Sequence, residues 1–369
     1  MMEMRGVISV GRPKLERISA GDEIKFPART AGCQNLLCCL SDCFYCGDRK
    51  SGSTINQQPN EMNILVTGGA GFIGSHLVEY FQDKAGVRVL DNLCSGFRDN
   101  LDGLQCEFLQ GSILDRDLVR RAMQGVDYVF HLAALVSVAE SMQKPVECAE
   151  TNTVGTLVVL EEAARAKVKK LVLSSSAAIY GDNPVVPKIE TMPPEPKSPY
   201  AISKLDGEFY SRMFAAEGRL QTVCLRYFNV FGPRQNPRSQ YAAAVPIFID
   251  RALKNELITI FGDGKQTRDF IYVQDVVAAN VFFATQSPAS GVFNVACGQR
   301  LTINELAASV CRLTGSRSEI KHAAERPGDV KHSLADIDKL RKAGFIPEGD
   351  FHMGLQTTIR FFKDHRQPA

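Results

Sequence analysis

Short apolar runs alternate with longer amphipathic segments from Met62 onward. The runs are apolar at consecutive positions, as in strands that are buried on both faces of a parallel sheet. The segments between them repeat with helical spacing, for example at Val154, Leu157, Val158 and Ala164. This alternation is typical of repeated strand–helix–strand units. The predicted strands are residues 63–67, 87–91, 107–110, 128–132, 170–174 and 222–227, and the clearest predicted helices are residues 71–81, 114–123, 150–166 and 200–216.

The pattern changes after Asn229, where proline, arginine and glutamine are followed by shorter mixed elements. We therefore expect the α/β class, with a doubly wound parallel sheet of Rossmann type in residues 62–230. Residues 231–369 are expected to form mainly a smaller C-terminal lobe that holds a substrate. Some of their segments could return to the Rossmann sheet.

Residues 1–61 show no sustained period, and a Rossmann sheet needs nothing before the strand that follows Met62. We expect an extension that is disordered or not part of the fold. Cys33, Cys38, Cys43 and Cys46 could bind zinc, but the paired C-x-x-C arrangement that indicates zinc is absent, so no metal is expected.

The charge balance argues against nucleic acid or a membrane as the main partner. There are 43 basic and 41 acidic residues, which give a formal charge of +2. No apolar run approaches the roughly 18 residues that span a bilayer, and no apolar core of a secretory signal is present. These features predict a cytoplasmic protein that acts on small soluble ligands.

A glycine-rich turn follows the first predicted strand. Gly69, Gly71 and Gly74 form G-x-G-x-x-G between this strand and a helix, which is the arrangement that brings a pyrophosphate to a helix N-terminus. Asp91 ends the next strand about 20 residues later, where a carboxylate can bind a ribose hydroxyl. Because a carboxylate would repel the 2′-phosphate of NADP, this residue favours NAD.

A tyrosine and a lysine four residues apart provide candidate chemistry. Tyr200 and Lys204 share one face of a predicted helix, so we expect the ammonium to lower the pKa of the phenol toward the range of a general base. The helix follows a strand that ends in three serines, residues 174–176, whose hydroxyls would lie at the carboxyl edge of the sheet.

Eight motifs resemble, in order, those of extended short-chain dehydrogenases/reductases, and specifically of nucleotide-sugar 4-epimerases. The resemblance covers about residues 62–363. The matching motifs are T-G-G-A-G-F-I-G at 67–74, D-N-L-C-S-G at 91–96, H-L-A-A at 131–134, S-S-S-A-A-I-Y-G at 174–181, Y-A-I-S-K at 200–204, R-Y-F-N-V-F-G-P-R at 226–234, T-R-D-F-I-Y-V at 267–273 and R-P-G-D-V at 326–330.

The resemblance implies a role for each matching residue. Tyr200 would be the base for the sugar 4-hydroxyl, Ser176 would bind the same oxygen, and Lys204 would hold the nicotinamide ribose. The other implied cofactor contacts are Gly68, Gly69, Gly71, Phe72, Ile73, Gly74, Asp91, Asn92, Ser95, Gly96, Ser112, Ile113, Ala133, Ala134, Asn152 and Tyr227. The implied substrate contacts are Ser176, Asn229, Arg268, Arg326, Asp329 and Ser333, in which Asn229 and the two arginines would bind the diphosphate and Asp329 the uridine ribose.

Two positions narrow the implied reaction and substrate. Related 4,6-dehydratases and decarboxylases carry acidic residues directly after the serine, whereas this chain has Ala177 and Ala178, so return of the hydride and hence epimerisation is expected. At the position of Ser333, the similar enzymes that are restricted to non-acetylated sugars have a tyrosine. A serine would leave room for a 2-acetamido group, as in the similar bacterial UDP-N-acetylglucosamine 4-epimerases, and Val136 in place of a lysine agrees with this.

The expected activity is therefore interconversion of UDP-N-acetylglucosamine and UDP-N-acetylgalactosamine, with UDP-glucose and UDP-galactose as further possible substrates. Two alternatives stay open, a 4-epimerase of UDP-glucuronate or UDP-N-acetylglucosaminuronate, and a non-catalytic NAD sensor. The family commonly dimerises through two helices per subunit, so a homodimer is expected. Ser112 departs from the aspartate that relatives often use near adenine, which predicts slightly weaker NAD binding.

Overall fold

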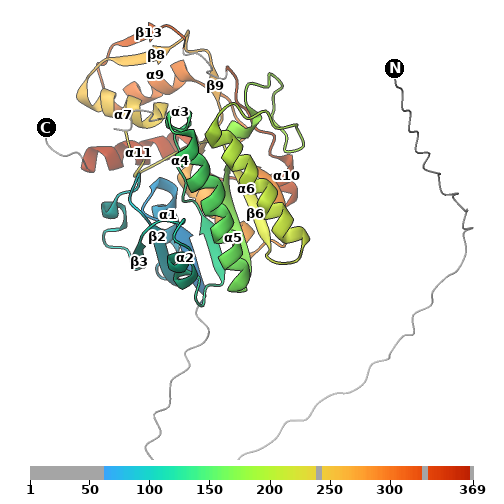
Figure 1. The fold of residues 1–369 in the computed structure, drawn as a ribbon. Helices are drawn as coiled ribbons and strands as arrows, with labels where there is room; N and C mark the ends of the chain where they lie inside the picture. Colours follow the sequence, from blue (N-terminus) through green and yellow to red (C-terminus); the bar gives the residue numbers. More distant parts are fainter. Residues whose placement is uncertain (1–61, 238–242, 326–330, 366–369) are drawn as a thin grey trace, which may run out of the picture. The chain divides into compact units, whose positions relative to one another are not determined.

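The computed structural model describes residues 62–237, 243–325 and 331–365. Its central element is a parallel sheet of seven strands in the order β11-β6-β5-β4-β1-β2-β3 (Figure 1). The strands are β1 (Asn63–Thr67), β2 (Gly86–Asp91), β3 (Glu107–Gln110), β4 (Tyr128–His131), β5 (Lys170–Ser176), β6 (Thr222–Tyr227) and β11 (Gly291–Val295). The predicted fold class and all six predicted strands are confirmed. The seventh strand, β11, comes from the predicted C-terminal lobe and pairs with β6.

Both faces of the sheet are covered by helices. Successive residues of a strand point to opposite sides, so each strand buries apolar side chains on both faces. In β1, Ile64 and Val66 pack in one cluster and Leu65 packs in the other. The first cluster includes residues of α1 (Phe72–Phe81), α8 (Val273–Thr285) and α10 (Asp338–Lys342). The second includes residues of α2 (Arg116–Ala122), α5 (Gly155–Arg165) and α6 (Pro199–Ala216), and Figure 1 shows α5 and α6 side by side.

The segment before α5 differs from the single helix predicted for residues 150–166. α3 (Val138–Gln143) and α4 (Pro145–Ala149) precede a π-helical turn, Glu150–Val154, which leads into α5. The turn carries Asn152, whose side chain accepts a hydrogen bond from the N–H of Leu135 (2.7 Å) and donates one to its carbonyl (3.0 Å). Turns of this kind often occur at functional sites in helices.

The remaining described residues build a smaller lobe around a third cluster of apolar side chains. Its helices are α7 (Ala244–Lys254), α9 (Ile303–Thr314) and α11 (Phe351–Asp364). Its strands pair as β7 (Asn229–Phe231) with β10 (Phe270–Tyr272), β9 (Thr267–Arg268) with β12 (Leu301–Thr302), and β8 (Ile258–Phe261) with β13 (Ile320–Ala323). Because β7 starts two residues after β6 ends, the lobe begins at the carboxyl edge of the sheet.

The predictions for the N-terminal extension cannot be compared with the described residues, whereas the absence of a membrane-spanning segment can. The cysteine cluster at residues 33–46 and the role of residues 1–61 lie outside the described part of the chain. Among residues 62–237, 243–325 and 331–365, no helix is long and apolar enough to span a membrane.

A buried histidine connects β1, β4 and α5. His131 is 1% exposed, its Nδ1 lies 2.7 Å from the hydroxyl of Thr67, and its Nε2 lies 2.9 Å from the hydroxyl of Thr156. Burial, helped by the positive charge of Lys204, lowers the pKa of His131 to about 3. The imidazole is therefore neutral in the folded protein at physiological pH.

This histidine should make the protein less stable in mild acid. Since His131 has a lowered pKa only when folded, protons favour the unfolded chain below about pH 6.5, and stability falls progressively until the folded pKa is reached. Between pH 6.5 and 5 we expect a loss of about 2 kcal/mol, which His131→Gln removes. Urea unfolding at pH 7 and pH 5 measures it, with the exposed His322→Gln as control. Equal acid sensitivity of the wild type and His131→Gln would contradict this.

Candidate active site

The loop between β1 and α1, together with the first turn of α1, is too tightly packed for side chains at Gly69 and Gly74. A Cβ atom on Gly74 would lie 2.2 Å from the carbonyl oxygen of Gly68, and one on Gly69 would lie 2.7 Å from Cγ1 of Val89. Gly68 has a φ of +72°, which other residues rarely adopt. α1 then begins at Phe72 without a side-chain cap. Its first amides can therefore bind an anion.

Asp91 lies at the end of β2 and supports this loop. Its carboxylate is 7% exposed and accepts hydrogen bonds from the N–H groups of Ala70 (2.9 Å) and Leu93 (2.8 Å). Burial raises the pKa of Asp91, and the two amide donors oppose that rise. The sequence predicted only a contact with a ribose hydroxyl, whereas the structure adds a role in holding the glycine loop.

Most residues predicted to bind the cofactor follow the carboxyl ends of β1 to β4, where open parallel sheets bind ligands. Asn152 lies in the π-helical turn before α5, and Tyr227 ends β6. A Cβ atom on Gly96 would lie 2.8 Å from the backbone of Ala70, so the loop after β2 packs directly against the glycine turn. The tight cradle, the free helix amides and the buried carboxylate fit a dinucleotide. The others of this set are Phe72, Ile73, Asn92, Ser95, Ser112, Ile113, Ala133 and Ala134.

The three predicted catalytic residues meet where β5 ends against the start of α6. Ser198 caps α6 by accepting a hydrogen bond from the N–H of Ala201 (3.1 Å), which places Tyr200 in the first turn. Ser176, the last residue of β5, is hydrogen-bonded to Tyr200. Lys204 Nζ donates to the carbonyl of Ser174 (2.9 Å) and lies 5.7 Å from the centre of the Tyr200 ring.

The electrostatics of this group correct one expectation. Burial raises the pKa of Tyr200, and the opposing effect comes from its hydrogen bond with Ser176, whereas the sequence predicted that Lys204 would lower it. Lys204 is directed to the Ser174 carbonyl, and its own burial lowers its pKa to about 8. The serine is thus the group that favours the phenolate form of Tyr200 in the protein itself.

A large cavity of about 650 Å³ adjoins this group. Four of the six predicted substrate residues line it, although they come from four distant parts of the sequence: Ser176, Asn229, Arg268 and Ser333. Arg326 and Asp329 lie outside the described residues. The cavity is also lined by Tyr227, whose hydroxyl donates to Asn280 Oδ1 of α8 (3.0 Å).

Sequence reasoning missed several residues of this cavity. Lys188, Lys197 and Asp182 belong to the segment between β5 and α6, which has no periodic pattern, and Val138 and Met142 belong to the short helix α3. Lys188 is 2% exposed and donates to the carbonyl of Asn183, and burial lowers its pKa.

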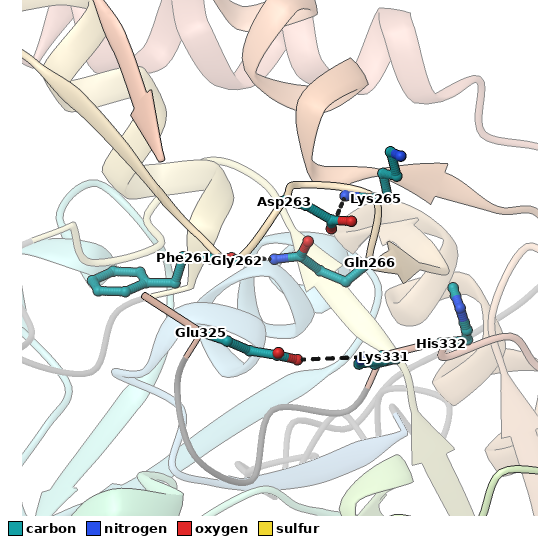
Figure 2. A pocket seen from close by; sticks show the side chains of 8 residues that line it. All are labelled: Phe261, Gly262, Asp263, Lys265, Gln266, Glu325, Lys331 and His332. Atoms are coloured by element: carbon teal, nitrogen blue, oxygen red, sulfur yellow. Dashed lines mark hydrogen bonds and ion pairs between the residues drawn. The ribbon is translucent and has the colours of Figure 1, made fainter. Parts of the chain in front are cut away.

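A second, small cavity of about 270 Å³ lies in the C-terminal lobe (Figure 2). Figure 2 shows Gln266 and the loop at Asp263 on one side, with Glu325 and Lys331 on the other. Glu325 and Lys331 form an ion pair of 3.9 Å and border the segment that carries Arg326 and Asp329. Gln266 also lies two residues before Arg268, so β9 connects the small cavity with the large one.

Comparisons with known proteins agree with this geometry. Residues 64–296 match the NAD dependent epimerase/dehydratase family. The UDP-glucose 4-epimerase of Mycolicibacterium smegmatis is 38% identical, over 83% of this chain and 100% of that protein.

Two solved structures are similar over nearly their whole length. A UDP-N-acetylglucosamine 4-epimerase from Methanobrevibacter ruminantium, in complex with UDP-N-acetylmuramic acid, is 42% identical with a TM-score of 0.80, over 83% of this chain and 99% of that chain. The UDP-glucose 4-epimerase of Thermus thermophilus, in complex with NAD, is 38% identical with a TM-score of 0.76, over 83% of this chain and 100% of that chain.

These comparisons confirm the predicted resemblance, the cofactor and the enzymatic character, so the reading as a non-catalytic sensor is set aside. The matched range includes both the glycine cradle and the Ser176–Tyr200–Lys204 group. The chain is an NAD-dependent enzyme that belongs to the NAD dependent epimerase/dehydratase family.

Proposed function

We propose that this enzyme is a UDP-sugar 4-epimerase that interconverts UDP-N-acetylglucosamine and UDP-N-acetylgalactosamine. The observation that carries the proposal is the composition of the large cavity. Its lining includes Ser176, the following residues Ala177 and Ala178, and Ser333. The alanines leave the two positions after Ser176 without an acid or base for a second reaction, and the exposed Asp182 is the acidic residue among those that line the cavity.

Tyr200, Ser176 and Lys204 have separate roles in the proposed reaction. Tyr200 takes the proton of the sugar 4-hydroxyl, and Ser176 hydrogen-bonds the same oxygen as its charge changes. Lys204 holds the nicotinamide ribose. Bound NAD would supply a reversible acceptor for the hydride of sugar carbon 4. The 4-keto sugar turns over within the large cavity, so that hydride would return to the opposite face of carbon 4 while Tyr200 returns the proton to the oxygen. Addition to the opposite face inverts the configuration at carbon 4.

The nucleotide is proposed to extend from the large cavity toward the small one. Arg268 on β9 would bind the diphosphate between the two, as a fixed guanidinium suits phosphate oxygens. Arg326 and Asp329 belong to the segment between Glu325 and Lys331, both of which line the small cavity. This arrangement would place the uridine in the small cavity and the sugar beside Ser176.

A second candidate is the 4-epimerase of UDP-glucuronate or UDP-N-acetylglucosaminuronate. Lys188 and Lys197 line the large cavity and could meet a sugar carboxylate. Incubation with UDP-N-acetylglucosamine, UDP-glucose and both uronates, followed by chromatography, separates the two candidates. The highest kcat/KM on UDP-N-acetylglucosamine supports the first, and the highest value on a uronate supports the second.

The size of residue 333 should set the sugar preference. The N–H of Ser333 donates to the carbonyl of Thr267 (3.1 Å), which fixes its backbone. Because Ser333 lines the large cavity, a tyrosine there should occupy part of that cavity. We expect Ser333→Tyr to lower kcat/KM for UDP-N-acetylglucosamine at least tenfold, about 1.4 kcal/mol, and to spare UDP-glucose. Both sugars are measured with one preparation, and equal losses on both would contradict the assignment.

A homodimer is also proposed. Ile202, Phe209 and Met213 of α6 are each more than 40% exposed, and Val154, which precedes α5, is 48% exposed. Apolar side chains exposed on α6 and on the π-helical turn that packs against it suit burial against a second copy of the chain.

A further inference from the structure

Three successive serines of β5 contact three successive turns of α6. Lys204 donates to the carbonyl of Ser174 (2.9 Å), and Tyr200 is hydrogen-bonded to Ser176. Ser175 lies between these two serines in β5, and its hydroxyl donates to Oε1 of Glu208 (2.5 Å), one turn beyond Lys204. Tyr200, Lys204 and Glu208 are spaced four residues apart, so they lie on one face of the helix. Glu208 thus extends the catalytic face by one turn.

Glu208 is joined to β6 by a buried ion pair. Arg226 donates through Nε to Oε1 (2.8 Å) and through Nη2 to Oε2 (2.7 Å), and both side chains are 5% exposed in this pair. A two-point contact between a planar guanidinium and a carboxylate fixes orientation as well as distance. It therefore sets how α6 sits against the ends of β5 and β6.

The network continues toward the large cavity. The guanidinium of Arg226 lies 4.8 Å from the centre of the Tyr180 ring, and the Tyr180 hydroxyl donates to Asn294 Oδ1 (2.6 Å). Asn294 in turn donates to the carbonyl of Lys188 (2.9 Å). Tyr180 and Lys188 both line the large cavity. One network thus connects the catalytic helix with the cavity wall.

Stability alone does not explain a pair of this kind. Taking two charges out of water costs several kcal/mol each, and apolar residues of similar volume are often at least as stable. Reacting groups, in contrast, must be held within about 0.5 Å of their productive positions, and an error of 1 Å can cost about 100-fold in rate. Glu208 lies on the helix of Tyr200, and its contacts run to Ser175, the neighbour of Ser176, and to Arg226 of β6.

We propose that Glu208 is a positioning residue which, through Ser175 and Arg226, holds Tyr200 and Ser176 at the distance where both contact one substrate oxygen. This inference rests on the proposed function for the identity of that oxygen. Glu208 itself does not contact the substrate. Its effect should appear in the proton-transfer step and leave nucleotide binding unchanged.

The first test removes one hydroxyl of the network. We expect Ser175→Ala to lower kcat about tenfold while KM for the UDP-sugar stays within about twofold, because the loosened group is one that moves a proton. The control is Ser211→Ala, which truncates a buried serine of α6 outside the contacts of Glu208. A Ser175→Ala enzyme with the kcat of the control would overturn the proposal.

The second test separates positioning from stability. Glu208→Leu and Arg226→Met are introduced together with Ser175→Ala, so that neither charge is left unpaired. We expect this variant to fold, to bind NAD and UDP like the wild type, and to lose at least tenfold in kcat. A folded variant that keeps wild-type kcat would show that the network only stabilises the protein.

A measurement that does not need turnover separates the positioning role of Glu208 from the proposed 4-epimerase function. NMR of ¹³C-labelled tyrosine follows the ionisation of Tyr200, which is assigned by its absence in Tyr200→Phe. Loosening of Ser176 should raise the pKa of Tyr200 in Ser175→Ala and in the triple variant, since the hydrogen bond from Ser176 lowers this pKa. An unchanged pKa would overturn the positioning role. A wild type that is inactive on every UDP-sugar would instead overturn the proposed function, and the titration would still decide the role of Glu208.

Discussion

Replacement of Tyr200 by phenylalanine is expected to lower kcat by roughly 10²–10⁴-fold, the usual cost of losing a general base. The aromatic ring remains in the first turn of α6, and only the hydroxyl bonded to Ser176 disappears. Affinities for NAD and UDP should therefore stay within about twofold, because the lost group acts on a proton. Steady-state turnover and calorimetric titration with UDP measure the two effects separately.

Tyr210→Phe is the matched control for this variant. It removes the hydroxyl of another tyrosine on α6, outside the contacts of Ser176 and Lys204, and should keep nearly full activity. Retention of more than about a tenth of wild-type kcat by Tyr200→Phe would refute the assignment of Tyr200 as the base.

Gly74→Ala should affect the cofactor more than any other single methyl group added to the glycine loop. The new Cβ atom would meet the Gly68 carbonyl at 2.2 Å, and backbone at that distance must move. Overpacking of this kind costs about 1–3 kcal/mol, which corresponds to a loss of roughly 5- to 150-fold in affinity if it falls on the bound state. We expect NAD to dissociate from the purified variant and activity to return in part with added NAD.

A control for Gly74→Ala separates folding from cofactor binding. Gly103 has a φ of +74° but open space around its Cβ position, so Gly103→Ala should lower stability and leave NAD affinity unchanged. If Gly74→Ala bound NAD as tightly as Gly103→Ala, the loop could not be the tight cradle that its geometry indicates.

Local signals in the sequence were sufficient for the sheet and the cofactor edge. The strands β1 to β6 are short apolar runs, and the glycine turn and Asp91 follow two of them at fixed spacing. β11 could not be placed in the same way, because its neighbour β6 ends at Tyr227, more than 60 residues earlier, and nothing local indicates that partner.

The substrate side of the site depends on tertiary structure. Resemblance alone pointed to Asn229, Arg268 and Ser333, and no spacing in the sequence predicts that they line one cavity with Ser176. The influence of Lys204 on Tyr200 was wrongly predicted because helical spacing says which residues share a face but not where a flexible ammonium points. In the structure the ammonium of Lys204 donates to the carbonyl of Ser174.

The proposed epimerisation requires that the hydrogen removed from sugar carbon 4 returns to the same sugar without exchange. Incubation of the enzyme with UDP-N-acetylglucosamine in D₂O, followed by mass spectrometry and NMR of the separated UDP-N-acetylhexosamines, tests it directly. We expect UDP-N-acetylgalactosamine with protium at carbon 4 and no added deuterium bound to carbon. Deuterium at a sugar carbon, a product that has lost water, or the absence of the 4-epimer would contradict it.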